Sequence, residues 1–395
     1  MEQCMIGSPN LQSKTIKVRT IAGLPSTVTS FLGAHPGGKA IILRHAGTDA
    51  TNAFEEVHPI ELLDEYLTAE HLVGELDVGA REKTKNEQTT TESPPMETIL
   101  NIEEMERLAL ERLSPKALAY YASGTDDEIT KVANGTIFKS ILLRPRVFID
   151  CTHCSLSTTL LGNRVGMPIF VSPAAMAKLA HPSGEVGIAK ACSKVNALQI
   201  ISKNASISVV DIVRAGPNAV FGWQLYVLKD IKATERTLAQ IRAIPQIKFI
   251  VLTLDAPFPG KREADERYKA TEPPRAWGTE SALTWHKTLA WLTTQTDLPI
   301  VLKVLLEIRK FCPQIMSQVE IWLDGGIKRG SDVVKALALG ARGVGLGRAA
   351  LYGLAVGGED GVSRSLQILA DETITTMRLL GASCVSELRP QHCCT

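Results

Sequence analysis

The sequence carries almost no net charge, because 43 Lys and Arg residues face 42 Asp and Glu residues in a chain of 395. A chain without an excess of one sign has no overall field that attracts nucleic acid or an anionic membrane, so neither is expected as a partner. No apolar stretch approaches the roughly 18 uninterrupted residues that a membrane span requires. The residues up to Thr20 also lack the apolar core of a secretory signal.

Paired cysteine motifs are scarce as well. The eight cysteines are scattered, and Cys151-Thr-His-Cys154 has no second Cys-x-x-Cys pair that would complete a zinc site. We therefore interpret them as reduced thiols, which indicates a cytoplasmic location. Lys14, Lys17 and Arg19 lie among Ser and Thr residues, a pattern faintly similar to a mitochondrial transit peptide. The mitochondrial intermembrane space is accordingly the alternative location.

A polar segment divides the chain into two parts. Residues 83–96 contain no apolar residue before Pro94-Pro95-Met96, which is typical of a linker. We therefore predict a small domain over residues 1–80, a linker over residues 81–97 and a large domain over residues 98–395. The large part has a size suited to a single α/β barrel.

Beyond the linker the pattern alternates between strands and helices. Asn101 followed by Glu104 predicts the start of one helix, and Ser114-Pro115 predicts a second that stops at Gly124. Short runs rich in Val, Ile and Leu then predict seven buried parallel strands. Their ranges are 167–172, 197–202, 219–227, 248–255, 298–304, 319–324 and 343–347. The predicted fold is an α/β (β/α)8 TIM-type barrel that lacks about one strand-helix unit, because a closed barrel needs eight strands.

Two histidines in the small part have a setting suited to metal binding. His35 begins His35-Pro36-Gly37-Gly38, a tight turn that lets a flat ligand approach the backbone, and His58 follows in an apolar context. Two neutral imidazoles on opposite sides of an apolar pocket would make a six-coordinate haem iron suited to electron transfer. Two core histidines are the alternative interpretation.

These residues resemble the cytochrome b5 family from about Ser26 to Leu76. The resemblance implies a small α+β domain that binds haem b through His35 and His58. The family's opening segment, with a tryptophan and a first strand ahead of the motif, is not found in this sequence. The small domain is therefore expected to be incomplete at its N-terminal side.

Polar residues stand where the predicted barrel strands end. Ser202, Gln224, Thr253 and Lys303 close four successive strands, so their side chains are expected in one mouth of the barrel. The segments 324–331 and 345–348 combine glycines with cations, a combination that predicts a phosphate site. Two basic solvent loops are the alternative.

Four motifs of the large part resemble the FMN-dependent L-2-hydroxy acid dehydrogenases and oxidases. They are Tyr120-Tyr121-Ala122-Ser123-Gly124, Leu254-Asp255-Ala256-Pro257, Gly260-Lys261-Arg262-Glu263 and Asp324-Gly325-Gly326. With the haem part in front, the whole chain resembles the flavocytochrome b2 family. The resemblance implies that FMN is held by Ala174, Ala175, Ser202, Gln224, Thr253, Lys303, Asp324, Gly326, Lys328, Gly347 and Arg348. Lys328 stands where the family has arginine, which keeps the charge but loses the bidentate fork.

The same resemblance assigns the substrate site. Tyr120, Tyr226 and Arg262 would bind a small 2-hydroxy acid, because an arginine fork captures a carboxylate while phenols orient it. Lys303 would lie near the flavin N1 side and stabilise negative charge there. Asp255 would support the imidazolium of a catalytic histidine.

That histidine is missing from the sequence. The family's sixth strand ends in a Ser-Asn-His-Gly-Gly-Arg-Gln type motif that supplies the base and a second arginine, whereas here Lys303-Val304 leads directly to Leu305. Two hypotheses follow. One is an L-lactate dehydrogenase that passes electrons through FMN and haem b to a cytochrome c type acceptor, as a homo-oligomer that the family suggests is a tetramer. The other is a non-catalytic flavin and haem binding form, from alternative splicing or a defective gene model.

Overall fold

The structure is a computed structural model that describes residues 17–21, 24–27, 39–46, 50–58, 94–256, 260–269, 279–303 and 318–394. The chain divides into two compact units. One comprises Met1–Glu55, Ile60–Glu87 and Thr271–Pro273, and the other comprises Glu56–Pro59, Gln88–Ala270 and Pro274–Thr395. Among the described residues, no helix combines the length and the apolar character needed to cross a membrane.

Among its described residues, the small unit contains two strands and two short helices. Strands β1 (Lys17–Ile21) and β2 (Leu24–Thr27) pair antiparallel, and helices α1 (Lys39–Arg44) and α2 (Thr51–Glu55) follow. Strands β1 and β2 both lie ahead of the His-Pro-Gly-Gly motif, and the expectation that the family's opening segment is incomplete stays a prediction. His35 itself is outside the described residues, and His58 is half-buried three residues after α2 ends.

The large unit is built on a parallel sheet of seven described strands. In the order of the chain they are β6 (Ile169–Val171), β7 (Leu198–Ile201), β8 (Val220–Leu225), β9 (Ile247–Thr253), β10 (Ile300–Lys303), β11 (Trp322–Asp324) and β12 (Gly343–Leu346). Their order across the sheet is β10-β9-β8-β7-β6-β12-β11. All seven predicted strands are confirmed. Within the described residues β10 and β11 are the two ends of the sheet, which is where a sixth barrel strand would pair with both.

Aromatic contacts show that this sheet curls toward a barrel. Trp322 of β11 lies with its ring centroid 5.5 Å from that of Phe249 in β9, although four strands separate β11 from β9 in the sheet. Its ring is also 5.1 Å from that of Phe170 in β6. The hairpin of β4 (Thr158–Leu160) and β5 (Asn163–Val165) adds Leu160 and Val165, both fully buried, to this interior cluster. The expected TIM-type barrel lacking a strand-helix unit is confirmed as a curled seven-stranded partial barrel.

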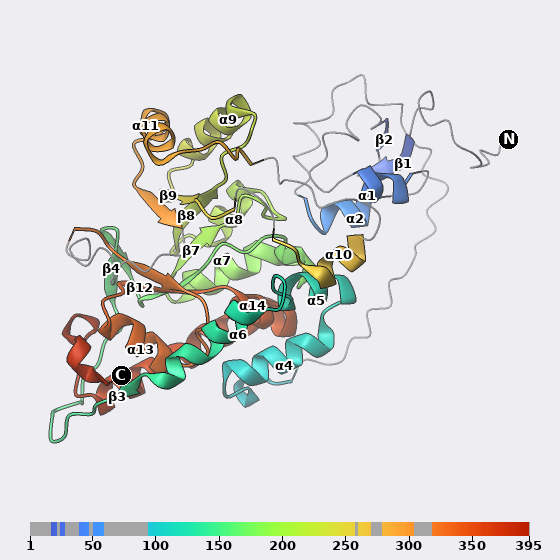
Figure 1. Ribbon diagram of the computed structural model, residues 1–395. Helices are drawn as coiled ribbons and strands as arrows, with labels where there is room; N and C mark the ends of the chain where they lie inside the picture. The colour runs from blue at the N-terminus through green and yellow to red at the C-terminus, as the bar shows by residue number, and fades with distance from the viewer. Residues whose placement is uncertain are drawn as a thin grey trace. The chain divides into compact units, whose positions relative to one another are not determined.

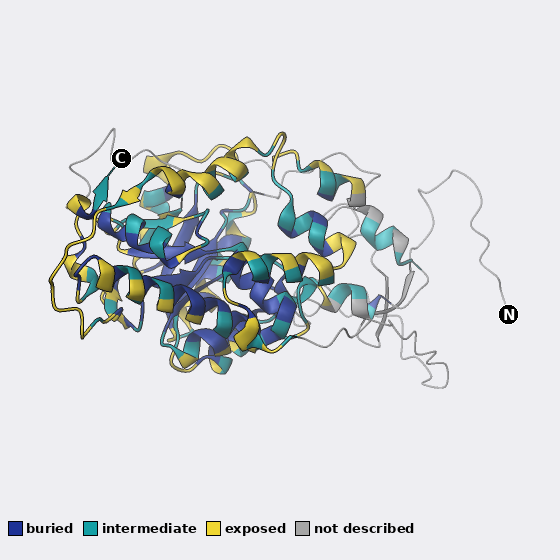
Figure 2. Ribbon diagram, turned by 90° about the horizontal axis from the view of Figure 1, so that it is seen from below, coloured by how far each residue is buried: buried dark blue, intermediate teal, exposed yellow. Residues whose placement is uncertain are grey.

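Helices surround the sheet and bury their apolar faces against it (Figures 1 and 2). Predicted caps begin two of them: the Asn101 side chain accepts from the Glu104 amide at 2.9 Å, and Ser114 accepts from the Ala117 amide at 3.2 Å. These caps satisfy amides that a helix start leaves open. The α-helices in the described part of the large unit are α4 (Ile102–Arg112), α5 (Pro115–Ala122), α6 (Ile129–Thr136), α7 (Gly184–Lys194), α8 (Val209–Ala215), α9 (Ile231–Arg242), α10 (Glu263–Lys269), α11 (Trp285–Gln295), α13 (Gly330–Ala338) and α14 (Arg348–Leu379). Short elements complete it: η3 (Met96–Thr98), η4 (Ile137–Ser140), β3 (Leu142–Leu143), η5 (Ala177–Leu179), η7 (Val385–Glu387), η8 (Pro390–His392) and β13 (Cys393–Cys394).

Candidate functional site

The alternation of side chains along each strand assembles one site at the carboxyl end of the sheet. Interior residues of six strands are Phe170, Ile200, Val251, Val301, Trp322 and Gly345, identified by the interior apolar cluster and the contacts around it. Because side chains two positions apart point to the same face, the residue two positions further along each chain segment also faces the interior. They are Ser172, Ser202, Thr253, Lys303, Asp324 and Gly347. All of these except Ser172 were predicted as site residues. The structure brings these five residues to one mouth of the barrel.

A buried hydrogen-bond network spans β7, β8 and β9 in this mouth. Ser202 Oγ donates to Gln224 Oε1 at 3.3 Å, and Gln224 Nε2 donates to Thr253 Oγ1 at 3.0 Å and to the Tyr226 hydroxyl at 3.0 Å. Ser202, Gln224 and Thr253 are each less than a tenth exposed. Linked polar groups in a dry interior are held rigidly, so they form a fixed floor of donors and acceptors.

Ser172 adds a side-chain hydroxyl that forms no hydrogen bond with the described residues. Among the described residues it is one of five whose side chain buries a polar atom with no hydrogen bond, and it directly follows β6. An unsatisfied buried hydroxyl costs about 1–3 kcal/mol, so such an atom is a candidate contact for a ligand. Ala174 and Ala175 follow in the same loop and are half-buried. The loop after β6 thus fits a bound flavin.

Two phenols and a guanidinium lie together beside the network. The Arg262 guanidinium carbon is 5.1 Å from the ring centroid of Tyr120, and Arg262 Nη2 donates to the carbonyls of Tyr120 at 2.6 Å and Ser123 at 3.0 Å. Burial raises the pKa of Tyr120 to about 12, against the opposing effect of Arg262. Burial also raises the pKa of Tyr226, and the carboxylate of Asp255 adds to the rise. Both phenols therefore stay protonated and can donate to an anionic ligand.

Lys303 and Asp255 lie at the carboxyl ends of adjacent strands. Lys303 is the last residue of β10, where it pairs in register with Thr253 of β9, and its side chain is half-buried. Asp255 follows β9 by two residues and is exposed. The structure therefore brings the predicted substrate and flavin residues of β8, β9 and β10 together at one end of the sheet.

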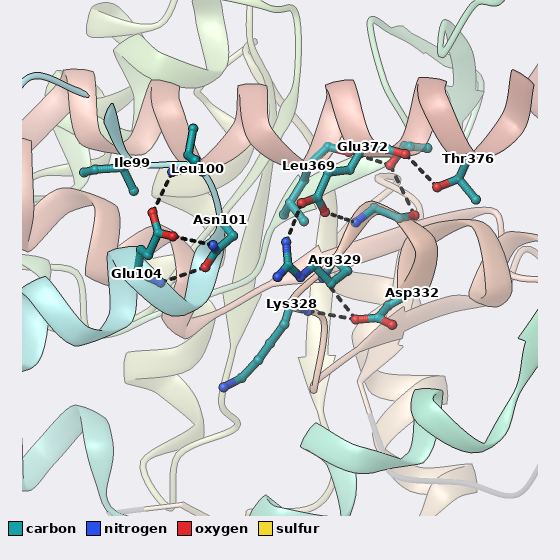
Figure 3. Close-up of polar contacts among 12 residues, drawn as sticks. Ile99, Leu100, Asn101, Glu104, Lys328, Arg329, Asp332, Leu369, Glu372 and Thr376 are labelled. Carbon is teal, nitrogen blue, oxygen red and sulfur yellow. Dashed lines mark hydrogen bonds and ion pairs between the residues drawn. The ribbon is translucent and has the colours of Figure 1, made fainter. Parts of the chain in front are cut away.

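The loop after β11 is largely committed to the protein itself. The Asp332 carboxylate accepts from the amides of Lys328 at 3.2 Å and Arg329 at 3.0 Å, and Glu372 accepts from the Gly330 amide at 2.7 Å (Figure 3). The Lys328 ammonium group lies 2.8 Å from a carboxylate oxygen of Glu106 in α4. Three amides and one cation that a phosphate site would use are already paired in this structure.

Gly326 likewise has a structural reason to be glycine. Its φ of +75° disfavours a side chain, and an added Cβ would lie 1.8 Å from the carbonyl oxygen of Asn134 in α6. The positive φ and the close Asn134 carbonyl therefore explain the glycine at this position without a phosphate contact.

The junction of β12 and α14 has the opposite character. An added Cβ at Gly347 would meet nothing within 4 Å, and Gly347 has no side chain that could cap the first amides of α14. Arg348 is the first residue of α14. Burial raises the pKa of Tyr352 to about 12 against the opposing effect of Arg348, and Lys131, with a smaller contribution from Arg348, lowers the pKa of Glu128. Open space, uncapped helix amides and a cation are the elements of an anion site.

Two residues that contact the candidate site or its loops were not predicted from the sequence. Glu106 neutralises Lys328, and Glu185 is a fully buried carboxyl at the start of α7. The Gly184-Glu185 pair, where α7 begins, was the available signal for the latter, because acidic residues favour a first helical turn. Cys151 and Cys154 are free thiols, and within the described part of the chain no cluster of His, Cys, Asp or Glu side chains is placed to hold a metal.

Comparison with known families identifies the class of protein. A profile described as FMN-dependent dehydrogenase matches residues 109–310 and 302–395, and one described as cytochrome b5-like heme/steroid binding domain matches residues 27–77. The chain belongs to the FMN-dependent dehydrogenase family and carries a cytochrome b5-like domain, with FMN and haem as the cofactors of these two parts. The two segments of the first match meet at residues 302–310, the position where a strand-helix unit is missing.

Individual relatives match either most of the chain or about three quarters of it. The chain is 33% identical over 433 residues to an L-lactate dehydrogenase (cytochrome) of Wickerhamomyces anomalus, covering 92% of this chain and 75% of the relative. It is 33% identical over 354 residues to glycolate oxidase of Spinacia oleracea, covering 74% and 95% of the two chains. The solved flavin-binding domain of baker's yeast flavocytochrome b2 matches with a TM-score of 0.72 and 33% identity, over 76% of this chain and 88% of that one.

Two alanine substitutions separate the two glycines of the proposed flavin phosphate site. Gly326→Ala is expected to destabilise the chain by about 1–3 kcal/mol, because the new methyl group collides with the Asn134 backbone at a positive φ. Gly347→Ala is expected to change stability by less than about 0.5 kcal/mol but to weaken FMN binding, since its methyl group enters open space. Thermal unfolding of the apoprotein and flavin titration measure the two effects. Equal loss of stability in both variants contradicts the distinction.

Proposed function

We propose that this chain oxidises an L-2-hydroxy acid, L-lactate, to the 2-oxo acid through FMN and passes single electrons through haem b to a cytochrome c type acceptor. The observation that carries the proposal is the buried network of Ser202, Gln224 and Thr253, which lies beside Tyr226 at the carboxyl end of the sheet. That end is where barrels of this type hold their chemistry. The relative's name, L-lactate dehydrogenase (cytochrome), supports L-lactate as the substrate and a cytochrome as the acceptor, and the c type follows from the family resemblance.

The proposed flavin contacts fall into two groups. The ring system would rest on Ser202, Gln224 and Thr253, with the loop that contains Ala174 and Ala175 beside it and with Lys303 next to Thr253. The phosphate would bind at Gly347 and Arg348, with Asp324, Gly326 and Lys328 lining the neighbouring loop. When bound, FMN supplies the acceptor for the hydride equivalent, and a cation close to it stabilises the added negative charge.

The proposed substrate site comprises Tyr120, Tyr226 and Arg262. The protonated phenols donate hydrogen bonds to the carboxylate and hydroxyl of the acid, and Arg262 neutralises the carboxylate. Its hydrogen bonds to the Tyr120 and Ser123 carbonyls hold the guanidinium beside the Tyr120 ring. Asp255 lies at the position that would support a catalytic imidazolium. The sequence has no histidine motif there to receive the proton, so a low rate is expected.

Removal of one cation tests the phosphate site. Arg348→Ala is expected to weaken FMN binding by roughly ten-fold to a hundred-fold, because a charge-assisted contact contributes on the order of 1.5–3 kcal/mol. Flavin fluorescence titration measures the change, and riboflavin, which has no phosphate, should bind parent and variant equally. Arg342→Ala is the matched control, since Arg342 is exposed and precedes β12 whereas Arg348 follows it. An unchanged FMN affinity in Arg348→Ala refutes the site.

We also propose that the chain works as a homo-oligomer, by resemblance a tetramer. Exposed apolar residues support this: Ile129 and Val132 on α6 are 73% and 61% exposed, and Val147 and Phe148 in the loop after β3 are exposed as well. Covering them with a second copy of the chain would remove apolar surface from water. The second candidate function, a non-catalytic flavin and haem binding form, is favoured by the missing histidine motif alone.

A further inference from the structure

A buried carboxyl group connects the two loops that follow β6 and β7. Glu185 is 1% exposed, and its Oε1 accepts hydrogen bonds from the Ala177 amide at 3.0 Å and the Ser206 amide at 2.9 Å. Ala177 belongs to the loop between β6 and α7, and Ser206 belongs to the loop between β7 and α8. A single oxygen atom therefore holds the backbone of both loops.

Further bonds join the same two loops around this point. The Lys178 amide donates to Ser206 Oγ at 3.2 Å, and the Met176 amide donates to the Asn204 carbonyl at 3.0 Å. Ser206 is fully buried, so water does not compete for these groups. The bonds form a compact clamp between the loops, with Glu185 at its centre.

These loops are the ones that carry three of the proposed flavin contacts. Ala174 and Ala175 precede Met176 and Ala177 in the first loop, and Ser202 precedes Asn204 in the second. The Asn204 amide also donates to Ser202 Oγ at 3.2 Å, which joins the clamp to the buried network of the mouth. A shift of one loop against the other would move Ser202 relative to the two alanines.

We propose that Glu185 is a positioning residue whose carboxyl group fixes the loops after β6 and β7 against each other and thereby sets the shape of the flavin site. The inference rests on the proposed function, because it takes Ala174, Ala175 and Ser202 as flavin contacts. Glu185 acts through these loops and does not itself touch the flavin. Its effect on the reaction is therefore expected in flavin binding.

The second oxygen of Glu185 guides the choice of variants. No donor among the described residues reaches Oε2 of Glu185 or Oε1 of Gln199. The amide nitrogen of Gln199 donates to the Glu185 carbonyl at 3.4 Å. Burial raises the pKa of Glu185, which favours the neutral acid. Glutamine mimics that form, because its carbonyl oxygen can accept from both amides and its nitrogen can take the place of Oε2. Methionine has a similar length and no oxygen.

The test is FMN titration of the full chain, monitored through flavin fluorescence and through the visible circular dichroism of the bound flavin. Glu185→Gln is expected to keep the parent affinity within about two-fold, whereas Glu185→Met leaves two buried amides without an acceptor and should weaken FMN binding by roughly ten-fold or more. Ser206→Ala removes the acceptor of the Lys178 amide and a donor to Glu185 Oε1 at 3.5 Å, and it should weaken binding by about two- to ten-fold. Both weakened variants should also alter the dichroism of the bound flavin.

A matched control separates positioning from general stability. Ser365→Ala removes a hydroxyl that is equally buried and donates to the Gly361 carbonyl within α14. It should lower the melting temperature by a similar amount and leave FMN affinity and dichroism unchanged. If Glu185→Met does not fold, the FMN affinity and dichroism of Ser206→Ala are compared with those of Ser365→Ala, and this comparison tests the inference. Parent-like FMN affinity and dichroism in Ser206→Ala overturn the inference, whereas a parent chain that binds no FMN overturns the proposed function beneath it.

Discussion

L-Lactate is expected to reduce the flavin of this chain at least about a hundred-fold more slowly than the flavin of a variant with a complete barrel. General base catalysis typically contributes about 10² to 10⁴ in rate, and the sequence lacks the motif that supplies the base. The same motif supplies a second carboxylate-binding arginine, so substrate positioning is also weaker. Both effects lower the rate of the same step.

The measurement is stopped-flow reduction of bound FMN by L-lactate in two proteins. One is the 395-residue chain, and the other carries the family's missing strand-helix unit with its His-Gly-Gly-Arg turn between Val304 and Leu305. Dithionite should reduce the flavin of both proteins rapidly, which confirms that the bound flavin is accessible and redox-active. Fast reduction by L-lactate in the unmodified chain would show that another group accepts the proton.

Haem binding is the second large effect. His58→Ala is expected to abolish the low-spin spectrum of the haem-loaded full chain, because a six-coordinate iron needs both axial imidazoles. His35→Ala should act in the same way. His45→Ala is the control, since His45 follows α1 without the flanking motif and should leave the spectrum unchanged. A low-spin spectrum that persists in His58→Ala contradicts the assignment of this ligand.

Strand positions and the mouth of the barrel could be predicted from the sequence because both depend on local rules. Runs of Val, Ile and Leu bounded by turns marked the strands, and the strand ends placed Ser202, Thr253 and Lys303 in one mouth of the barrel. The Asn101 and Ser114 caps followed from equally short patterns. In each case the information lies within a few residues along the chain.

Contacts between distant segments could not be predicted in this way. Glu106 pairs with Lys328, although 222 residues separate them in the sequence, and the Asn134 carbonyl explains Gly326. Glu185 accepts from the Ser206 amide although 21 residues separate them in the sequence. The sequence therefore predicted which residues reach the mouth, but not which of them are already engaged by the protein.

The strand order also determines when the large unit can form on a growing chain. Strands β6 to β10 pair one after another in the order of synthesis, but β12 pairs with β6 in the register Val344↔Ile169, and β11 joins the sheet through β12. Joining ends that are more than 170 residues apart costs about 1–2 kcal/mol more entropy than closing a 30-residue loop. Helix α4 packs against α14, so this contact also cannot form until α14 has been synthesised. The side of β6 that pairs with β12 therefore stays unpaired until residues 343–346 have been synthesised.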